Sequence, residues 1–366
     1  MALEQIVKRE IASLEPYEPG KPIDELEREL GIEGAIKLAS NENPLGPSPR
    51  ALEAARRALG EMHRYPDGGS FRLRRRLASH LGVEPHEIVL GTGADEIFEL
   101  LVKTFVRPGD EVVYAWPSFA MYPIVTQGAG GRSVPVALDA GLVHDLAGIR
   151  AAVTPRTRLV FVCNPNNPTG TSIGANELDA FVETLPSHVV LVMDEAYCEF
   201  ARRPDFPQAL KWIAKRPGTM VLRTFSKIYG LAGLRVGYGV GDAELVGYLE
   251  RARHPFNVNS IAQAAAEAAL DDVDHVAATR RVNAQGVEYL TRELRALGIE
   301  VWPTDANFIL ARAGGRATYE RLLREGVIVR PLAGFGLHEH VRITIGLPEE
   351  NERLVKALRR LRQEAA

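Results

Sequence analysis

The sequence is poor in cysteine: only Cys163 and Cys198 occur among its 366 residues. Two thiols make no disulfide framework, and such scarcity is typical of a protein that works in a reducing cytoplasm. The chain also lacks any apolar run near the roughly 20 residues needed to cross a bilayer, and its first residues hold no apolar signal core. We therefore expect a cytoplasmic protein with neither a membrane span nor an export signal.

Neither sign of charge is in large excess. Lys and Arg number 44 and Asp and Glu 47, which gives a net charge of −3. This balance argues against a nucleic acid or an anionic membrane as the main partner. Hydrophobic residues make up 46% and charged residues 25%, as in proteins with a sizeable core. The length suggests about two domains at roughly 150 residues each.

Between about Pro85 and Gly239, short apolar runs alternate with amphipathic segments. This alternation predicts an α/β domain in which helices cover a mostly parallel sheet. Helices are expected at residues 94–106 and 118–127. Strands are expected at residues 87–91, 111–115, 158–164, 189–195, 219–225 and 234–240.

After His254 the pattern changes. Residues 261–297 have helical spacing and are rich in Ala, Glu and Arg. Strand candidates at 307–312, 327–331 and 341–346 and a last helix at 349–362 predict a smaller α+β domain. The first 40 or so residues indicate a helix, a loop and a second helix that pack on it. We predict a large domain over residues 40–255 and a small domain made of 1–39 and 256–366.

Lys227 is the most informative residue of the chain. It lies in RTFSKIYGLAGLRVG (223–237), close to the hydroxyl residues Thr224 and Ser226 and eight positions before Arg235. A lysine can form an imine with an aldehyde cofactor, and hydroxyls with an arginine can hold that cofactor's phosphate. The segment therefore predicts a pyridoxal 5′-phosphate site.

Further polar residues follow the expected strands, where ligands of open parallel sheets bind. Asp194 can pair with a protonated ring nitrogen, although a lone acid at a strand end is more often a cap. Asn167 lies in CNPNNPTG (163–170), a strong turn signal. Its amide can donate to the ring oxygen of the cofactor, and so can Tyr197.

The first expected strand is followed by Thr92 to Glu96, which open a helix. Gly93 lets the backbone approach an anion, and free N–H groups at a helix start bind phosphate. A plain capping motif is at least as common. Phe119 can stack on a ring or belong to the core. Each signal is weak alone, but their occurrence at consecutive strand ends is strong evidence for a cofactor site.

This set of motifs resembles the fold-type I pyridoxal-phosphate-dependent aminotransferases, and more closely the histidinol-phosphate aminotransferase family. The resemblance covers nearly the whole chain. It implies a large domain with a mostly parallel seven-stranded sheet, a smaller α+β domain and a homodimer with shared active sites. The matching segments are, in order, KLASNENPLGPSP (37–49), RYPDG (64–68), GTGADE, NPNNPTG, DEAY, the Lys227 segment, ANFIL and VRITIG.

The resemblance also implies roles for residues of the cofactor site. Lys227 is expected to be the Schiff-base lysine, and Asp194 to pair with the pyridine nitrogen. Asn167 and Tyr197 are expected to form hydrogen bonds with the ring oxygen. Phe119 takes the stacking position, where the family often has tyrosine. Tyr65 reaches the phosphate from the other subunit. The remaining phosphate contacts are expected from Gly93, Ala94, Asp95, Thr224, Ser226 and Arg235.

Substrate contacts follow from the same resemblance. Arg342 matches the arginine that binds the anionic group of the substrate, and Arg330 matches a second arginine nearby. Tyr17 is expected to approach the neighbour's substrate pocket, and Asn43 is also expected at the substrate. Alone, Arg342 can be a surface charge, but its place inside the short strand VRITIG disfavours that. We also expect a cis Asn167–Pro168 bond, although trans is the default, and no metal site.

The expected reaction is transamination of L-histidinol phosphate with 2-oxoglutarate, giving imidazole-acetol phosphate and glutamate in histidine biosynthesis. An aromatic amino-acid aminotransferase on the same scaffold is the main alternative, and a phospho-amino-acid decarboxylase of this fold is a weaker one. A pyridoxal-phosphate-sensing transcription regulator would need a DNA-binding domain that the first 40 or so residues do not offer. A non-catalytic binding protein is disfavoured because Lys227, Asp194 and Arg342 are all present.

Overall fold

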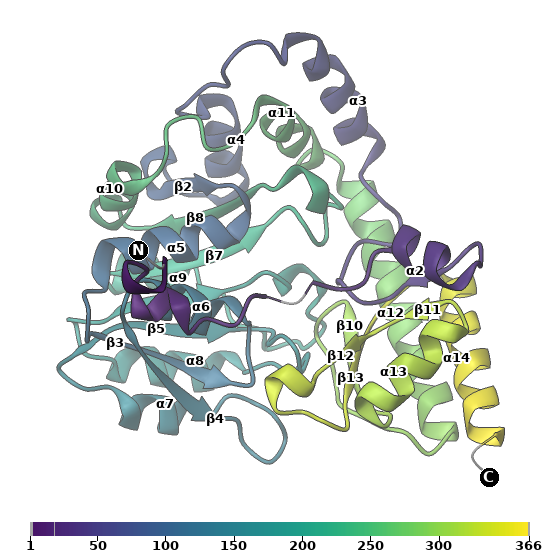
Figure 1. The fold of residues 1–366 in the computed structure, drawn as a ribbon. Coiled ribbons are helices and arrows are strands. Elements are labelled where there is room, and N and C mark those ends of the chain that lie inside the picture. The colour runs from purple at the N-terminus through teal and green to yellow at the C-terminus, as the bar shows by residue number, and fades with distance from the viewer. Residues whose placement is uncertain (1–2, 18, 365–366) are drawn as a thin grey trace.

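The computed structural model describes residues 3–17 and 19–364. Its larger part is built on a seven-stranded sheet of order β2-β8-β7-β6-β5-β3-β4 (Figure 1). Strand β8 runs antiparallel to β2 and β7, and all other neighbours are parallel. The predicted α/β fold with a mostly parallel seven-stranded sheet is thus confirmed. The strands are β2 (Ile88–Gly91), β3 (Glu111–Trp116), β4 (Arg132–Ala137), β5 (Thr157–Cys163), β6 (Val190–Asp194), β7 (Thr219–Thr224) and β8 (Gly237–Gly241).

Both faces of this sheet are buried, because successive side chains of a strand point to opposite sides. In β5, Val160 and Val162 belong to one apolar cluster, and Leu159 and Phe161 to the other. Three helices cover the second cluster: α5 (Gly93–Phe105), α6 (Met121–Gly128) and α10 (Ala243–Ala252). The first is covered by α3 (Pro49–Ala58), α4 (Phe71–Leu81), α7 (Leu146–Ala152), α8 (Ala175–Thr184), α9 (Lys211–Lys215) and α11 (Ser260–Ala269).

Strand β4 was not among the strands expected from the sequence. It pairs only with β3, at the edge of the sheet, and none of its residues is fully buried. It also contains Pro135, which lacks a backbone N–H and is tolerated in a sheet mainly at an edge. The apolar signal that marks the central strands is therefore weak here.

The smaller part contains a four-stranded antiparallel sheet of order β12-β13-β10-β9. Its strands are β9 (Glu300–Val301), β10 (Phe308–Arg312), β12 (Arg330–Pro331) and β13 (Val341–Thr344). Helices α13 (Gly315–Arg324) and α14 (Pro348–Gln363) pack with it, and β1 (Ile36–Lys37) pairs with β11 (Val327–Ile328). The predicted strands and last helix of this part are confirmed.

Helix α12 (Val273–Ala296) connects the two parts. Near its start, Arg280 Nε donates to the carbonyl of Glu199 in the larger part at 2.7 Å. Near its end, Leu290 and Leu294 belong to the core of the smaller part. Between them, a β-carbon on Gly286 would lie 2.3 Å from the Ile345 side chain, so the close packing of this helix requires glycine.

The N-terminal segment divides between the two parts. Helix α2 (Ile23–Leu30) packs on the smaller part, where Leu26 lies in a cluster with Ile328. Helix α1 (Arg9–Ala12) instead lies against α6, where Gln127 Nε2 donates to the Glu10 carbonyl at 3.0 Å. The expected packing of this whole segment on the smaller part is therefore wrong for α1. The domain boundaries themselves stay predictions.

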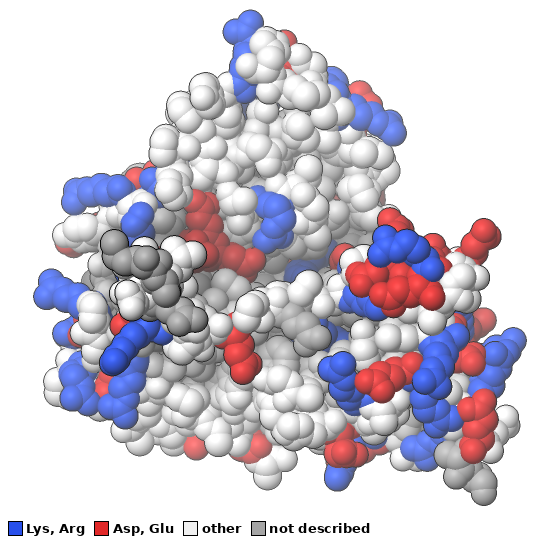
Figure 2. All heavy atoms as spheres, viewed as in Figure 1, with Lys and Arg blue, Asp and Glu red and all other residues white. Residues whose placement is uncertain are grey.

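Charged side chains of both signs are scattered over the face drawn in Figure 2, as the small net charge leads one to expect. That face is hollowed between the part that carries α3 and the part that carries α2 and α13 (Figures 1 and 2). Within residues 3–17 and 19–364, no helix combines the length and the apolar character that crossing a membrane requires.

Candidate active site

A cavity of about 250 Å³ lies beyond the carboxyl ends of the parallel strands, between the larger and the smaller part. Parallel strands bring these ends to one edge of the sheet, which is where ligands of such folds bind. The cavity gathers most of the site residues expected from the sequence. They are Tyr17, Ala94, Asp95, Phe119, Asn167, Asp194, Tyr197, Thr224, Ser226, Lys227, Arg235, Arg330 and Arg342.

Lys227 follows β7 and presents its amine to this cavity. Its Nζ donates to the Ser40 carbonyl at 3.3 Å and lies 5.6 Å from the centre of the Tyr197 ring. Burial, helped by the positive charge of Arg342, lowers the pKa of Lys227 to about 8. Because half of the amine is then neutral at pH 8, it is available as a nucleophile and a base.

Asp194 ends β6 and is only 3% exposed. Its Oδ2 accepts from the Tyr122 hydroxyl at 2.7 Å and its Oδ1 from the Ala196 N–H at 3.1 Å. Burial raises the pKa of Asp194 to about 6, against the opposite effect of the Tyr122 bond. No ion pair joins this carboxylate to a cation of the described residues. A buried carboxylate without a cation suits a cationic ligand atom such as a protonated ring nitrogen.

Two further hydrogen-bond donors are directed into the cavity by their neighbours. Arg342 Nη1 donates to Asn167 Oδ1, which leaves the amide nitrogen of Asn167 free to donate. Asn41 Nδ2 donates to the Tyr197 hydroxyl at 2.9 Å, which leaves the proton of that hydroxyl free. Burial also raises the pKa of Tyr197, so the phenol stays protonated. The expected cis Asn167–Pro168 bond is confirmed.

The other end of the cavity is an anion cradle at the start of α5. Arg235 Nη2 contacts Asp95 Oδ2 at 3.0 Å, and Arg235 Nη1 lies 3.4 Å from Ser226 Oγ. Thr224 Oγ1 accepts from the Ser226 N–H at 3.0 Å. Gly93 has φ +75°, and a β-carbon there would lie 2.5 Å from Arg235 Nη2. Only glycine therefore lets the arginine lie against the N–H groups of this helix start.

Arg342 and Arg330 come from paired strands of the smaller part. Arg342 is 7% exposed, and its Nη2 donates to the Ala39 carbonyl at 2.7 Å. Its Nε is buried and has no partner among the described residues. Its guanidinium borders the cavity, and no carboxylate of the described residues pairs with it. A buried cation without a carboxylate suits an anionic ligand group. The Arg330 guanidinium lies 5.5 Å from the centre of the Tyr17 ring.

Asn43 and Tyr17 lie elsewhere than predicted, whereas the expected role of Tyr65 stays a prediction. Asn43 does not line the cavity, because its Nδ2 donates to the Ile228 carbonyl and to Thr279 Oγ1. Tyr17 lines the cavity of its own chain, whereas we expected it at the neighbour's. Tyr65 is 83% exposed and absent from its own chain's cavity, as a residue that serves another subunit would be.

The sequence reasoning missed two residues of the site, Asn41 and Tyr122. Asn41 lies two positions before Asn43, and its φ of +55° is a conformation that asparagine adopts more readily than most residues. Nothing in the sequence distinguished it from Asn43. Tyr122 lies inside an apolar helix, and only the rule that a buried hydroxyl needs a partner could have drawn attention to it.

Comparison with known proteins agrees with this geometry. Residues 33–358 match the family model "Aminotransferase class I and II". The chain is 48% identical to histidinol-phosphate aminotransferase 1 of Nitrosococcus oceani over 98% of both chains. It is 51% identical to histidinol-phosphate aminotransferase 2 of Pseudomonas fluorescens over 95% of both.

Solved structures agree as well. The histidinol-phosphate aminotransferase of Sinorhizobium meliloti, in complex with pyridoxal 5′-phosphate, superposes with a TM-score of 0.90 at 32% identity and 98% coverage of both chains. Aspartate aminotransferase of Thermus thermophilus with maleate gives a TM-score of 0.84 at 26% identity, over 98% of this chain and 99% of that one. The chain therefore belongs to the class I and II aminotransferases and, among them, to the histidinol-phosphate aminotransferase family.

Proposed function

We propose that this protein transfers the amino group of L-histidinol phosphate to 2-oxoglutarate, with pyridoxal 5′-phosphate as cofactor, in histidine biosynthesis. The observation that carries the proposal is one cavity with a low-pKa lysine, a buried unpaired carboxylate and an anion cradle at one end. At its other side is a buried arginine with an unpaired Nε. The names of the relatives at about 50% identity support the same substrate.

The residues present fit the cofactor. Gly93 leaves room for Arg235 beside the start of α5, where backbone N–H groups suit a phosphate. Asp194 offers a carboxylate to the ring nitrogen, and Asn167 and Tyr197 offer donors to the ring oxygen. Phe119 borders the cavity as an aromatic surface for the ring. When bound, pyridoxal phosphate supplies an aldehyde that exchanges the amino group and a ring that withdraws electrons from the substrate α-carbon.

Lys227 performs two tasks in this proposal. Its neutral amine would attach covalently to the aldehyde of the cofactor with loss of water, and would be set free when a substrate amine takes its place. The freed Nζ accepts the proton of the substrate α-carbon and gives it back as an acid. A pKa of about 8 suits both tasks, because the amine changes protonation state near neutral pH.

Arg342, with Arg330 beside it, binds the anionic end of both substrates. Histidinol phosphate has a phosphate and no carboxylate, whereas 2-oxoglutarate has carboxylates only. A guanidinium can bind either anion through two parallel N–H donors. One arginine pair can therefore serve both halves of the reaction, because the Arg342 and Arg330 side chains both line the cavity.

Substrate preference tests this assignment. With 2-oxoglutarate as acceptor, we expect kcat/KM for histidinol phosphate to exceed that for phenylalanine and tyrosine at least about a hundredfold, because the doubly charged phosphate can bond both arginines whereas an amino-acid carboxylate carries one charge. Steady-state kinetics with the three donors measure this ratio. Equal or higher values for the aromatic amino acids would instead make the protein an aromatic aminotransferase.

The chain is proposed to act as a homodimer in the cytoplasm. The Tyr65 and Phe256 rings stack at 4.9 Å, and both are exposed, as are Met62 and Phe71 in the neighbouring sequence. Exposed aromatic groups of this kind are typical of protein interfaces. Tyr65 is then free to reach the phosphate cradle of a second copy. The two cysteines form no disulfide, in keeping with a reducing compartment.

Mixed dimers test the shared site. A Lys227→Ala subunit lacks the lysine, and a Tyr65→Ala subunit lacks the phosphate contact that it would give its partner. In a heterodimer purified through two different tags, one site has both defects and the other has none. We expect about half of wild-type activity at limiting cofactor. A heterodimer no more active than the Tyr65→Ala homodimer would show that Tyr65 serves its own chain.

A further inference from the structure

Thr92 occupies the N-cap position of α5 but does not cap the helix. A threonine there normally bonds a backbone N–H of the first turn through its side-chain oxygen. Here Thr92 Oγ1 donates to the Asn257 carbonyl at 2.6 Å, and no side-chain cap bond is made. No side chain of the described residues bonds the N–H groups of Gly93, Ala94 or Asp95, so they stay free for an anion.

The backbone carbonyl of Asn257 is the acceptor that draws the Thr92 hydroxyl away from the N–H groups of α5. Its Nδ2 donates to the Leu90 carbonyl at 3.0 Å and to Glu96 Oε2 at 2.8 Å. The same Glu96 oxygen accepts from the Thr92 N–H at 2.5 Å. Asn257 therefore bonds residues on both sides of Thr92, one at the end of β2 and one in the first turns of α5.

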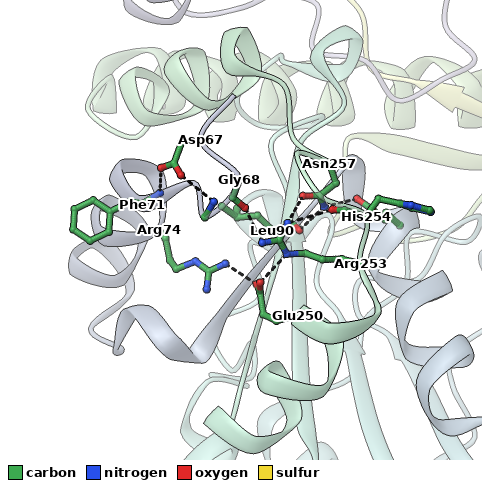
Figure 3. A network of polar contacts seen from close by, with 11 residues as sticks. Asp67, Gly68, Phe71, Arg74, Leu90, Glu250, Arg253, His254 and Asn257 are labelled. Atoms are coloured by element: carbon green, nitrogen blue, oxygen red, sulfur yellow. Dashed lines mark hydrogen bonds and ion pairs between the residues drawn. The ribbon is translucent and has the colours of Figure 1, made fainter. Parts of the chain in front are cut away.

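Arg253 in turn fixes Asn257 (Figure 3). Its Nη1 donates to Asn257 Oδ1 at 3.2 Å, and its Nη2 to the Gly68 carbonyl at 2.7 Å. Its Nε donates to Glu250 Oε2 at 2.7 Å, and Glu250 Oε1 accepts from Arg74 Nη2 at 2.6 Å. Gly68 lies three residues after Tyr65, so one guanidinium joins the cradle of its own chain to the segment that carries Tyr65.

We propose that Asn257, fixed by Arg253, is a positioning residue that keeps Thr92 from capping α5 and so reserves the N–H groups of that helix start for the cofactor phosphate. Neither residue lines the cavity. Asn257 acts on Thr92 through its own backbone carbonyl, and Arg253 acts through the side chain of Asn257. The inference rests on the proposed function, because it concerns the phosphate end of the same cofactor site.

A double-mutant cycle tests the proposal through binding, without turnover. Cofactor-free protein is titrated with pyridoxal 5′-phosphate and with pyridoxal, which lacks the phosphate, and absorbance gives both Kd values. Asn257→Ala should raise the Kd for pyridoxal 5′-phosphate about fivefold, as expected when a hydroxyl competes for helix-cap donors, and change that for pyridoxal less than about twofold. Thr92→Val alone should change either Kd less than about twofold.

The combined variant gives the decisive result. Thr92→Val removes the competing hydroxyl, so Thr92→Val/Asn257→Ala should recover most of the affinity that Asn257→Ala loses. If the two substitutions caused independent structural defects, their losses of affinity for pyridoxal 5′-phosphate would instead add. Additive losses, or an equal loss for both ligands in Asn257→Ala, would overturn the proposal. Wild-type protein that binds pyridoxal as tightly as its phosphate would overturn the proposed function instead.

Two further variants complete the experiment. If Asn257→Ala does not fold, Arg253→Lys takes its place, because lysine keeps the charge but cannot bond Gly68, Glu250 and Asn257 together. It should show the same phosphate-selective loss and the same recovery by Thr92→Val. Asp145→Ala removes the N-cap of α7, so it should lower Tm and leave the ratio of the two Kd values unchanged.

Discussion

Replacing Lys227 by alanine is expected to lower kcat/KM for histidinol phosphate at least about 10⁴-fold, the upper range of positioned acid–base catalysis. The variant loses both the amine proposed to attach the cofactor and the base proposed to move the α-proton. Pyridoxal phosphate should still bind, because the contacts of Asp194, Arg235 and the start of α5 remain. Single-turnover kinetics and the absorbance of the bound cofactor measure the two effects separately.

The pH dependence of cofactor attachment tests the same lysine in the wild-type protein. Burial lowers the pKa of Lys227 to about 8, and only the neutral amine attacks an aldehyde. The rate of covalent attachment to cofactor-free protein should therefore rise about tenfold per pH unit below 8 and level off above it. A midpoint near 10, the value for an exposed lysine, would contradict the buried environment described here.

Two control variants separate chemistry from charge. Lys227→Arg keeps a positive charge in the cavity but has no nucleophilic amine, so it should be as inactive as Lys227→Ala. Lys356→Ala changes an exposed lysine on α14 and should leave kinetics and attachment unaltered. Turnover by Lys227→Ala above about a hundredth of the wild-type rate would contradict the acid–base role assigned to the lysine.

The strand-end residues were predictable because their positions follow from topology. Each apolar run of strand length ends at the same edge of a parallel sheet, so the residues that follow must share one site. Asp194 and Asn167 entered the prediction in this way, whereas Lys227 was found through its hydroxyl neighbours, and all three line the cavity. The central strands were recognised because burial on both faces makes them uniformly apolar.

The residues that were missed depend on contacts that no local pattern encodes. Asn41 and Asn43 are two residues apart in one motif, and only the positive φ of Asn41 and the bonds of Asn43 to Ile228 and Thr279 decide which faces the cavity. Tyr122 reaches Asp194 from 72 positions away. The diversion of Thr92 likewise depends on the distant Asn257.

Replacing Asp194 by asparagine is the second substitution expected to act strongly, with a loss of about a thousandfold in kcat/KM. Breaking a buried ion pair costs about 3 to 5 kcal/mol, and here the pair would be that of the carboxylate with the protonated ring nitrogen of the cofactor. Asparagine keeps the shape, and its one carbonyl oxygen can still accept the Tyr122 hydroxyl, although the longer bond from the Ala196 N–H is lost. The loss should therefore appear in chemistry and cofactor affinity, and not in the fold.

The stability of the cofactor-free protein should change in the opposite direction. The pKa of Asp194 in the folded chain, about 6, lies above the 3.8 of an exposed aspartate, so ionisation of this buried group costs the fold about 2 to 3 kcal/mol at neutral pH. Asparagine removes that cost, and cofactor-free Asp194→Asn should have the higher Tm at pH 7. In the wild-type protein the cost declines as pH falls from 6 towards 4, because the folded chain takes up the proton first.

The difference in Tm between variant and wild type should therefore shrink over that pH range. A variant that is both inactive and less stable at pH 7 would indicate a structural role for Asp194.

Tyr122→Phe provides a graded comparison. It removes the hydrogen bond that holds the pKa of Asp194 down, so it should weaken activity by about tenfold, the effect of one hydrogen bond to a charged group. A buried carboxylate that destabilises the empty protein and is needed for turnover is what a site shaped for a cationic ring requires.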